Sequence, residues 1–88
     1  MIKLKVKYHL TPEGLLYFPA WYKACQEETS KQPGFVDMFM ESESQIPIVH
    51  LHFQDERTLS EWTDREKHDE FVDQIQAHFS KPPEIYRL

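Results

Sequence analysis

The sequence of 88 residues contains no asparagine, only one cysteine and only two glycines. Its single cysteine, Cys25, cannot form a disulfide within the chain, which fits the reducing cytoplasm where we expect the protein to reside. Cys25 falls on an apolar helix face, so we expect a buried thiol there. The sequence has no glycine-rich phosphate loop, no nucleophile elbow and no cysteine-pair metal motif.

Long hydrophobic runs and an excess of positive charge are also absent. The opening residues, MIKLKVKY, alternate, so we expect neither a signal peptide nor a membrane-spanning segment. The formal net charge of −5 argues against a nucleic-acid-binding groove. Hydrophobic residues make up 40% of the chain, enough for the core of one domain spanning residues 1–88. A domain this small buries only about 60–65% of its unfolded surface, so a second subunit would help to stabilise it.

Alternation and helical spacing predict a strand followed by a helix in the first third of the chain. Residues 2–10 alternate between an apolar face and a face of lysines, a period typical of a strand. Residues 11–14 are expected to form the turn that ends this strand. Residues 15–31 are predicted to be helical, with Pro19 at the first regular position. The apolar stripe of this helix is formed by Phe18, Trp21, Tyr22 and Cys25.

The rest of the chain predicts a hairpin, a broken helix and a last strand. Residues 35–41 and 47–54 alternate on either side of a polar turn at 42–46, which indicates a β-hairpin. A short helix should begin after Asp55 as its N-cap. The capping-box spacing of Thr63 and Glu66 should then restart a second helix. Residues 84–88 complete the order β-α-β-β-α-β.

This order predicts an α+β fold of the ferredoxin-like type, a four-stranded antiparallel sheet with the helices on one face. The face with Tyr8 and its apolar neighbours should lie under the helices. The other face carries lysines and histidines together with Phe35, Phe39 and Ile48, which would be exposed in a monomer. A second subunit that packs its sheet against this face would bury them, so we expect a homodimer.

Three features of the chain resemble a known family. They are the order of the elements, the Pro33-Gly34-Phe35 entry to the second strand, and residues 53–68, FQDERTLSEWTDREKH. These features are similar to the antibiotic biosynthesis monooxygenase family. The resemblance implies a homodimer whose sheets form an α+β barrel, with a pocket between helices and sheet in each subunit. Some members oxygenate quinol or polyphenol substrates without metal or flavin, and others degrade haem.

The sequence departs from the catalytic members, which place an asparagine of the first strand beside the tryptophan. This chain offers Lys7, Tyr8 and His9 in that strand instead. The haem-degrading members place their iron-ligand histidine at the level of residues 71–73, beyond His68. Haem degradation by the family's mechanism is therefore not expected.

Trp62 and His68 are the strongest candidates for catalytic residues, because the helix break should direct both toward the same interior. A cofactor-free oxygenase needs a base that ionises a phenol or an acidic C–H group, and histidine suits this role. Trp62 could stack on an aromatic ring. The candidate ligand-binding residues are Tyr22, Tyr8 and Trp21. A structural interpretation is also open, in which Trp62 fills the break, His68 bonds a backbone carbonyl and the aromatic stripe packs the core.

His9, His50 and His52 form a second candidate group. His50 and His52 share a strand face, and we expect the first and third strands to be parallel neighbours, which would place His9 beside them. Three imidazoles could bind Zn²⁺ or Cu²⁺, but Lys5 and Lys7 on the same face would repel a cation. We therefore expect neither a metal nor a cofactor.

These observations favour a protein that binds a small aromatic or quinol-type molecule and oxygenates it without a cofactor. Its base or polar anchor would be His68. Two alternatives stay open. One is a non-catalytic ligand-binding or regulatory module, which the missing asparagine favours. The other is a protein that binds haem through His68 without turnover.

Overall fold

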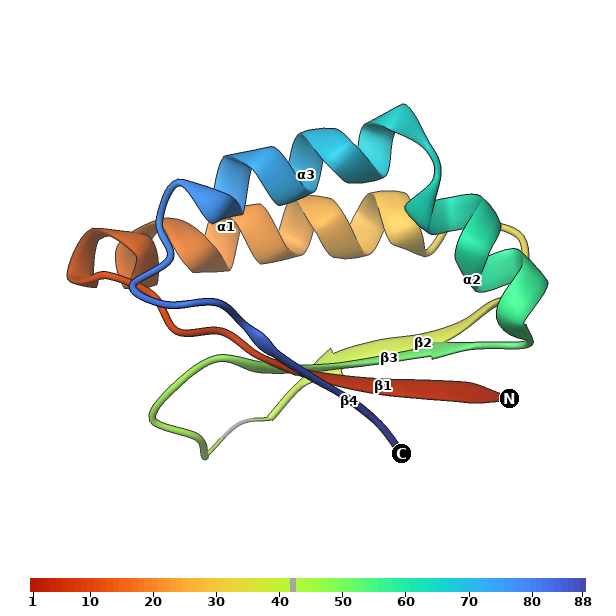
Figure 1. Ribbon diagram of the computed structural model, residues 1–88, viewed down its shortest axis with the longest axis horizontal. Coiled ribbons are helices and arrows are strands. Elements are labelled where there is room, and N and C mark those ends of the chain that lie inside the picture. Colours follow the sequence, from red (N-terminus) through yellow and green to blue (C-terminus); the bar gives the residue numbers. More distant parts are fainter. Residues whose placement is uncertain (42) are drawn as a thin grey trace.

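A computed structural model of the chain describes residues 1–41 and 43–88. Four antiparallel strands, in the order β2-β3-β1-β4, form one layer, and the helices pack on one face of this sheet (Figure 1). The elements are β1 (Ile2–Lys7), α1 (Pro12–Thr29), β2 (Phe35–Met40), β3 (Ile48–Phe53), α2 (Glu56–Thr63), α3 (Glu66–Gln76) and β4 (Glu84–Arg87). This arrangement confirms the predicted α+β ferredoxin-like fold.

Helix α1 begins at Pro12, before the predicted start, and Pro19 lies inside the helix rather than at its first position. The N-cap is Thr11, whose side-chain oxygen accepts a hydrogen bond from the N–H of Gly14 at 3.1 Å. Pro12 occupies the first turn, where no amide donor is needed. The sequence expected to form a turn is therefore a helix start, and β1 ends earlier, at Lys7.

Strand β1 lies between β3 and β4 and is antiparallel to both. The expectation that the first and third strands are parallel neighbours is wrong. Lys5 lies opposite His50, and His9 lies beyond the end of β1, away from the histidines of β3. The three histidines are not brought together. The described residues contain no group of three or more His, Cys, Asp or Glu side chains that could hold a metal ion.

An irregularity in β2 changes which aromatic residues face the helices. The register shifts between Phe35 and Asp37, so Phe35 lies opposite Phe53 and contacts its ring edge-on, with the centroids 6.1 Å apart. Ile48 is buried in the single chain, with 8% of its surface exposed. Of the three residues expected to be exposed in a monomer, Phe39 is exposed, at 42%. The bulge and local packing account for the other two.

The break between α2 and α3 is present but is not made by the predicted capping box. Asp55 caps α2 as expected, because its carboxylate accepts a hydrogen bond from the Thr58 N–H at 2.9 Å. Thr63 instead closes α2, where its hydroxyl donates to a carbonyl of the same helix. The N-cap of α3 is Arg65, whose side chain makes no capping hydrogen bond.

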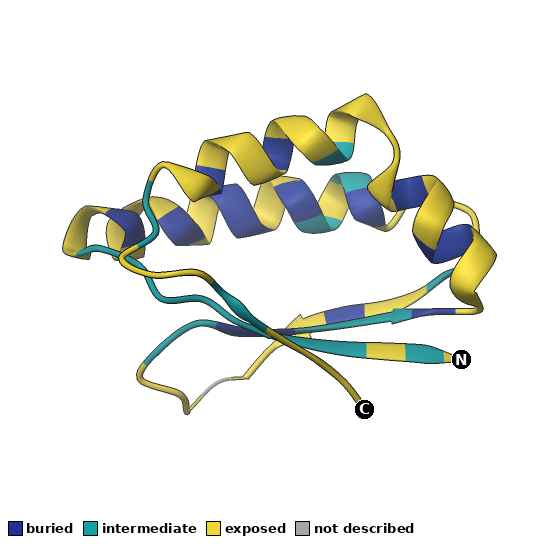
Figure 2. Ribbon diagram, viewed as in Figure 1, coloured by how far each residue is buried: buried dark blue, intermediate teal, exposed yellow. Residues whose placement is uncertain are grey.

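The core fills the space between the two layers, where the buried positions of the helices and of β2 and β3 face each other (Figure 2). Its buried members are Phe18, Trp21, Tyr22, Cys25, Met38, Val49, Phe53, Leu59, Trp62, Phe71 and Ile75. Within the described residues, no helix is long and apolar enough to cross a membrane. The polar turn expected at 42–46 includes Ser42, which lies outside the described residues.

Candidate functional site

A cavity of about 310 Å³ lies between the helices and the sheet. Its floor is formed by apolar side chains of the strands, including Leu4, Val6 and Leu51, and its roof includes Phe71 and Ile75 of α3. No lysine, arginine, aspartate or glutamate among the described residues lines it. The cavity therefore offers an apolar environment in which a small number of polar atoms can orient a ligand.

Trp62 and His68 both line this cavity. Trp62 comes from the last turn of α2 and is only 2% exposed, and His68 comes from the first turn of α3. Their rings meet edge to face, with centroids 5.4 Å apart and an interplanar angle of 83°. The helix break produces this contact, because it turns the chain between the two side chains.

The imidazole of His68 makes no hydrogen bond with the described residues. Its Nδ1 is buried without a partner. The Oδ1 atom of Asp69 lies 3.9 Å away, too far for a hydrogen bond. Burial lowers the pKa of His68, and the nearby Asp69 carboxylate opposes this effect. The ring is therefore neutral at neutral pH, and it lines the cavity without a hydrogen bond to the described residues.

Tyr8 also lines the cavity, and its hydroxyl makes no hydrogen bond with the described residues. Its ring packs against Phe18 and Trp21, with centroid distances of 5.3 and 5.8 Å. Burial strongly raises the pKa of Tyr8, so the hydroxyl keeps its proton. Tyr8 lies beside Phe79, past the end of α3, whereas His68 lies at its start. The two unbonded polar groups thus lie toward opposite ends of the cavity.

The other two candidate ligand-binding residues are engaged within the protein. Trp21 lines the cavity, but its indole N–H donates a hydrogen bond to the carbonyl of Phe71 at 2.9 Å, which joins α1 to α3. Tyr22 is not part of the cavity wall. Its hydroxyl accepts a hydrogen bond from Gln26 at 3.3 Å. The polar groups free to meet a ligand are therefore those of Tyr8 and His68.

Cys25 is buried on α1, as expected, and its side chain forms part of the cavity wall. Burial raises the pKa of the thiol to about 11, although a hydrogen bond with Thr29 opposes the rise. The thiol is protonated at neutral pH and is a poor nucleophile.

Sequence reasoning did not single out Pro83 and Ile85, which also line the cavity. Ile85 lies opposite Val6 in the sheet register, so it shares the helix-facing side with the alternating apolar residues of β1. The alternation in β4 is a weak signal, because the strand has only four residues.

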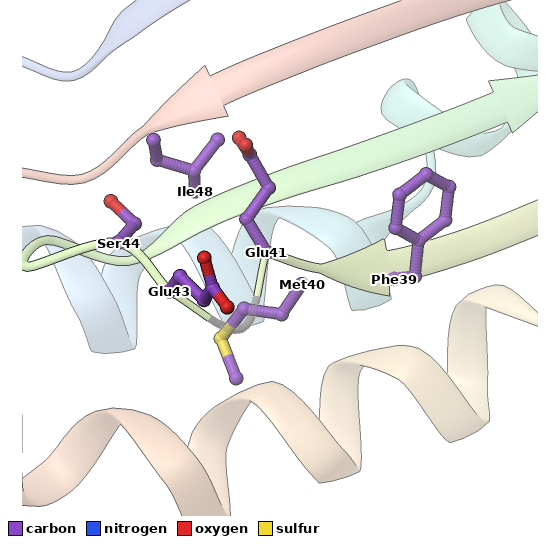
Figure 3. A pocket seen from close by; sticks show the side chains of 6 residues that line it. All are labelled: Phe39, Met40, Glu41, Glu43, Ser44 and Ile48. Atoms are coloured by element: carbon purple, nitrogen blue, oxygen red, sulfur yellow. The ribbon is translucent and has the colours of Figure 1, made fainter.

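A second hollow, of about 510 Å³, lies where β2 ends and β3 begins (Figure 3). It is lined by Phe39, Met40, Glu41, Glu43, Ser44 and Ile48. Phe39 stacks on the neighbouring His50, with centroids 4.8 Å apart, and Nε2 of His50 lies 3.2 Å from Glu41. None of the candidate catalytic or ligand-binding residues lies in this hollow.

Comparisons with known proteins identify the fold. No protein-family model and no curated protein matches the sequence. Among solved structures, a conserved protein from Methanosarcina mazei Go1 aligns with a TM-score of 0.89 at 23% identity, over 99% of this chain and 89% of that one. An antibiotic biosynthesis monooxygenase aligns with a TM-score of 0.88 at 16% identity, over 100% and 96% of the two chains.

A third structure is that of SnoaB, a cofactor-independent oxygenase from Streptomyces nogalater. It aligns with a TM-score of 0.82 at 10% identity, over 97% of this chain and 89% of that one. At identities this low, the alignments establish the fold of the chain and not its activity. The resemblance expected from the sequence is confirmed at that level, and the chain has the fold of the antibiotic biosynthesis monooxygenases.

Proposed function

We propose that the protein binds a small aromatic molecule of the quinol type beside Trp62 and His68 and oxygenates it without metal or flavin. The observation that carries this proposal is a neutral, unbonded imidazole in contact with an indole, in the wall of an otherwise apolar cavity. The oxygenase fold of the structural neighbours supports it. A neutral imidazole accepts a proton from a phenol, and the indole provides an aromatic surface for the ring.

The proposed chemistry begins with a proton transfer to the imidazole of His68 from a phenol or an adjacent acidic ring methylene. The resulting anion donates one electron to O₂, and the organic radical and superoxide then combine into a peroxide anion. The protonated His68 returns its proton to this anion, which gives a hydroperoxide. At a methylene carbon, loss of water from the hydroperoxide leaves a carbonyl group, so CH₂ and O₂ become C=O and H₂O. His68 is then neutral again and ready for another cycle. Tyr8, which stays protonated, would donate a hydrogen bond to an oxygen at the far end of the substrate.

The second candidate function is a non-catalytic ligand-binding or regulatory module. The observation that favours it is the complete absence of asparagine from the chain. An apolar cavity with two isolated polar groups can bind a ligand without turning it over. The two functions share a ligand site and differ in whether O₂ is consumed.

Oxygen uptake with a panel of one-ring and two-ring hydroquinones tests the enzyme proposal. We expect O₂ consumption with at least one compound, unaffected by a metal chelator. The variant His52→Gln is a matched control, because His52 is a histidine of β3 outside the cavity wall. It should consume O₂ at the wild-type rate. If compounds bind in calorimetry but none consumes O₂, the oxygenase proposal is wrong and the binding module is the function.

We also propose that the protein is a homodimer in which the helix-free sheet faces pack together, and that it resides in the cytoplasm. The open face carries Phe39, which is 42% exposed, and an aspartate at this position should prevent the packing. Light scattering is expected to give twice the chain mass of 10.6 kDa for the wild type and the single-chain mass for Phe39→Asp. Leu16→Asp, on the exposed side of α1, should remain dimeric. A monomeric wild type would contradict the proposal.

A further inference from the structure

We propose that the cavity selects uncharged ring systems of at most two fused rings, with an oxygen directed to His68. The geometry also points to their route of entry, which lies between α3 and β4, past Val72 and Ile85. This inference rests on the proposed binding function and adds the size, charge and route of the ligand.

The volume of the cavity sets the size of the ligand. An apolar protein cavity of about 150 Å³ holds one benzene molecule. The present cavity, at about 310 Å³, has twice that space. It can therefore hold a naphthalene-sized molecule with one or two polar substituents. A three-ring molecule would have to displace the buried side chains of the roof, among them Phe71 and Ile75, which are 8% and 2% exposed.

The composition of the wall sets the charge of the ligand. A carboxylate or phosphate in this cavity would lose its hydration without gaining a cation, because no lysine or arginine among the described residues lines it. Its polar contacts would be limited to neutral groups, including the Tyr8 hydroxyl and the neutral imidazole of His68. Such groups suit a phenol hydroxyl or a quinone carbonyl. An uncharged ligand is therefore preferred over its anionic analogue of the same shape.

The exposure of the lining residues indicates where the ligand enters. Most side chains of the wall are buried or half-buried, but Val72 of α3 and Ile85 of β4 are 39% and 63% exposed. Thr63, at the end of α2, is also exposed. All three residues line the same cavity, and β4 is the edge strand next to β1, so this part of the wall borders solvent. Two exposed apolar side chains on the rim of an apolar cavity form a mouth that a neutral aromatic molecule can pass.

Calorimetry under argon separates this inference from the proposed function. The probes are a naphthol, the corresponding naphthoate and an anthrol, which differ from one another in charge or ring number. We expect the naphthol to bind at least tenfold more tightly than either of the others. If naphthoate or anthrol binds as tightly as naphthol, the selectivity is wrong while the binding function stands. If none of the three binds, the binding function itself fails.

Stopped-flow binding of the naphthol tests the route. Ile85→Trp is expected to lower the association rate constant at least tenfold, because the indole would cover the mouth. Val72→Trp covers it from the opposite side and provides a second test if the first variant does not fold. Leu16→Trp, an exposed apolar residue of α1 outside the cavity wall, is the matched control and should bind at the wild-type rate. Wild-type association rates in both mouth variants would overturn the route.

Discussion

Replacing His68 with glutamine is expected to lower kcat/KM for oxygenation of an aromatic substrate by about 10²- to 10⁴-fold, the usual contribution of a general base. Glutamine keeps a polar side chain of similar reach but cannot accept a proton at neutral pH. The indole of Trp62 and the apolar cavity remain, so the dissociation constant of a non-reactive naphthol should change much less than the rate. Oxygen uptake and calorimetry on the same protein sample measure the two effects separately.

The pH profile distinguishes a base from a structural histidine. The active form is the neutral imidazole, so kcat/KM should be lost as pH falls through the pKa of His68 and be constant above it. Because burial lowers this pKa, the loss should occur below the usual histidine value of about 6.5. Removing the opposing carboxylate by Asp69→Asn should move the loss to still lower pH. A His68→Gln variant that kept the wild-type rate and the wild-type profile would contradict the role of His68.

Folding stability, like kcat/KM, should decrease as pH falls and His68 becomes protonated. The unfolded chain binds a proton on His68 more readily than the folded chain does, because only the folded state buries the ring. The folded protein therefore loses stability as pH falls below the unfolded pKa. The pH-rate profile must accordingly be recorded where circular dichroism shows that the protein is still folded.

The fold could be predicted because alternation and helical stripes are carried by many residues at once. The expected parallel pairing of β1 and β3 was wrong, although the order of the elements excludes it. A right-handed crossover makes β1 and β2 parallel, and the hairpin then reverses the chain, so β3 must be antiparallel to β1. The bulge beside Phe35 depends on packing against Phe53, a partner distant in sequence. Local patterns do not contain such information.

The placement of Trp62 and His68 in one wall could be predicted because both flank the same helix break. The residues that cap the helices on either side of the break could not all be predicted. Thr63 has the spacing of a capping box, but in the structure it completes α2, and the N-cap of α3 is Arg65. The hydrogen bond of Trp21 could not be predicted either, because its indole N–H donates to the carbonyl of Phe71, fifty residues away in sequence. Sequence patterns indicate which side chains share a face. Contacts with residues distant in sequence determine which of these side chains keep an unused hydrogen-bonding group.

Gly34 is the position where the fold depends most sharply on a single residue. It joins α1 to β2 with a φ of +83°, a conformation that side-chain-bearing residues rarely adopt. Its carbonyl accepts a hydrogen bond from the N–H of Gln54 at 2.8 Å, which fixes it beside the end of β3. A Cβ atom on Gly34 would overlap the side chain of Thr58. Thr58 is buried at 5% exposure and is held by Asp55 at the start of α2.

The substitution Gly34→Ala is therefore expected to lower the free energy of unfolding by about 3 kcal/mol. The left-handed backbone accounts for about 1–2 kcal/mol, and the displacement of Thr58 accounts for about 1–3 kcal/mol. The melting temperature should fall by about 12–24 °C in thermal denaturation at matched protein concentration. A double-mutant cycle with Thr58→Gly separates the two causes, because alanine at position 34 then meets only the backbone strain. An unchanged melting temperature for Gly34→Ala would mean that α2 does not pack on this turn. The turn would then not help to hold α2, the helix that carries Trp62, in place.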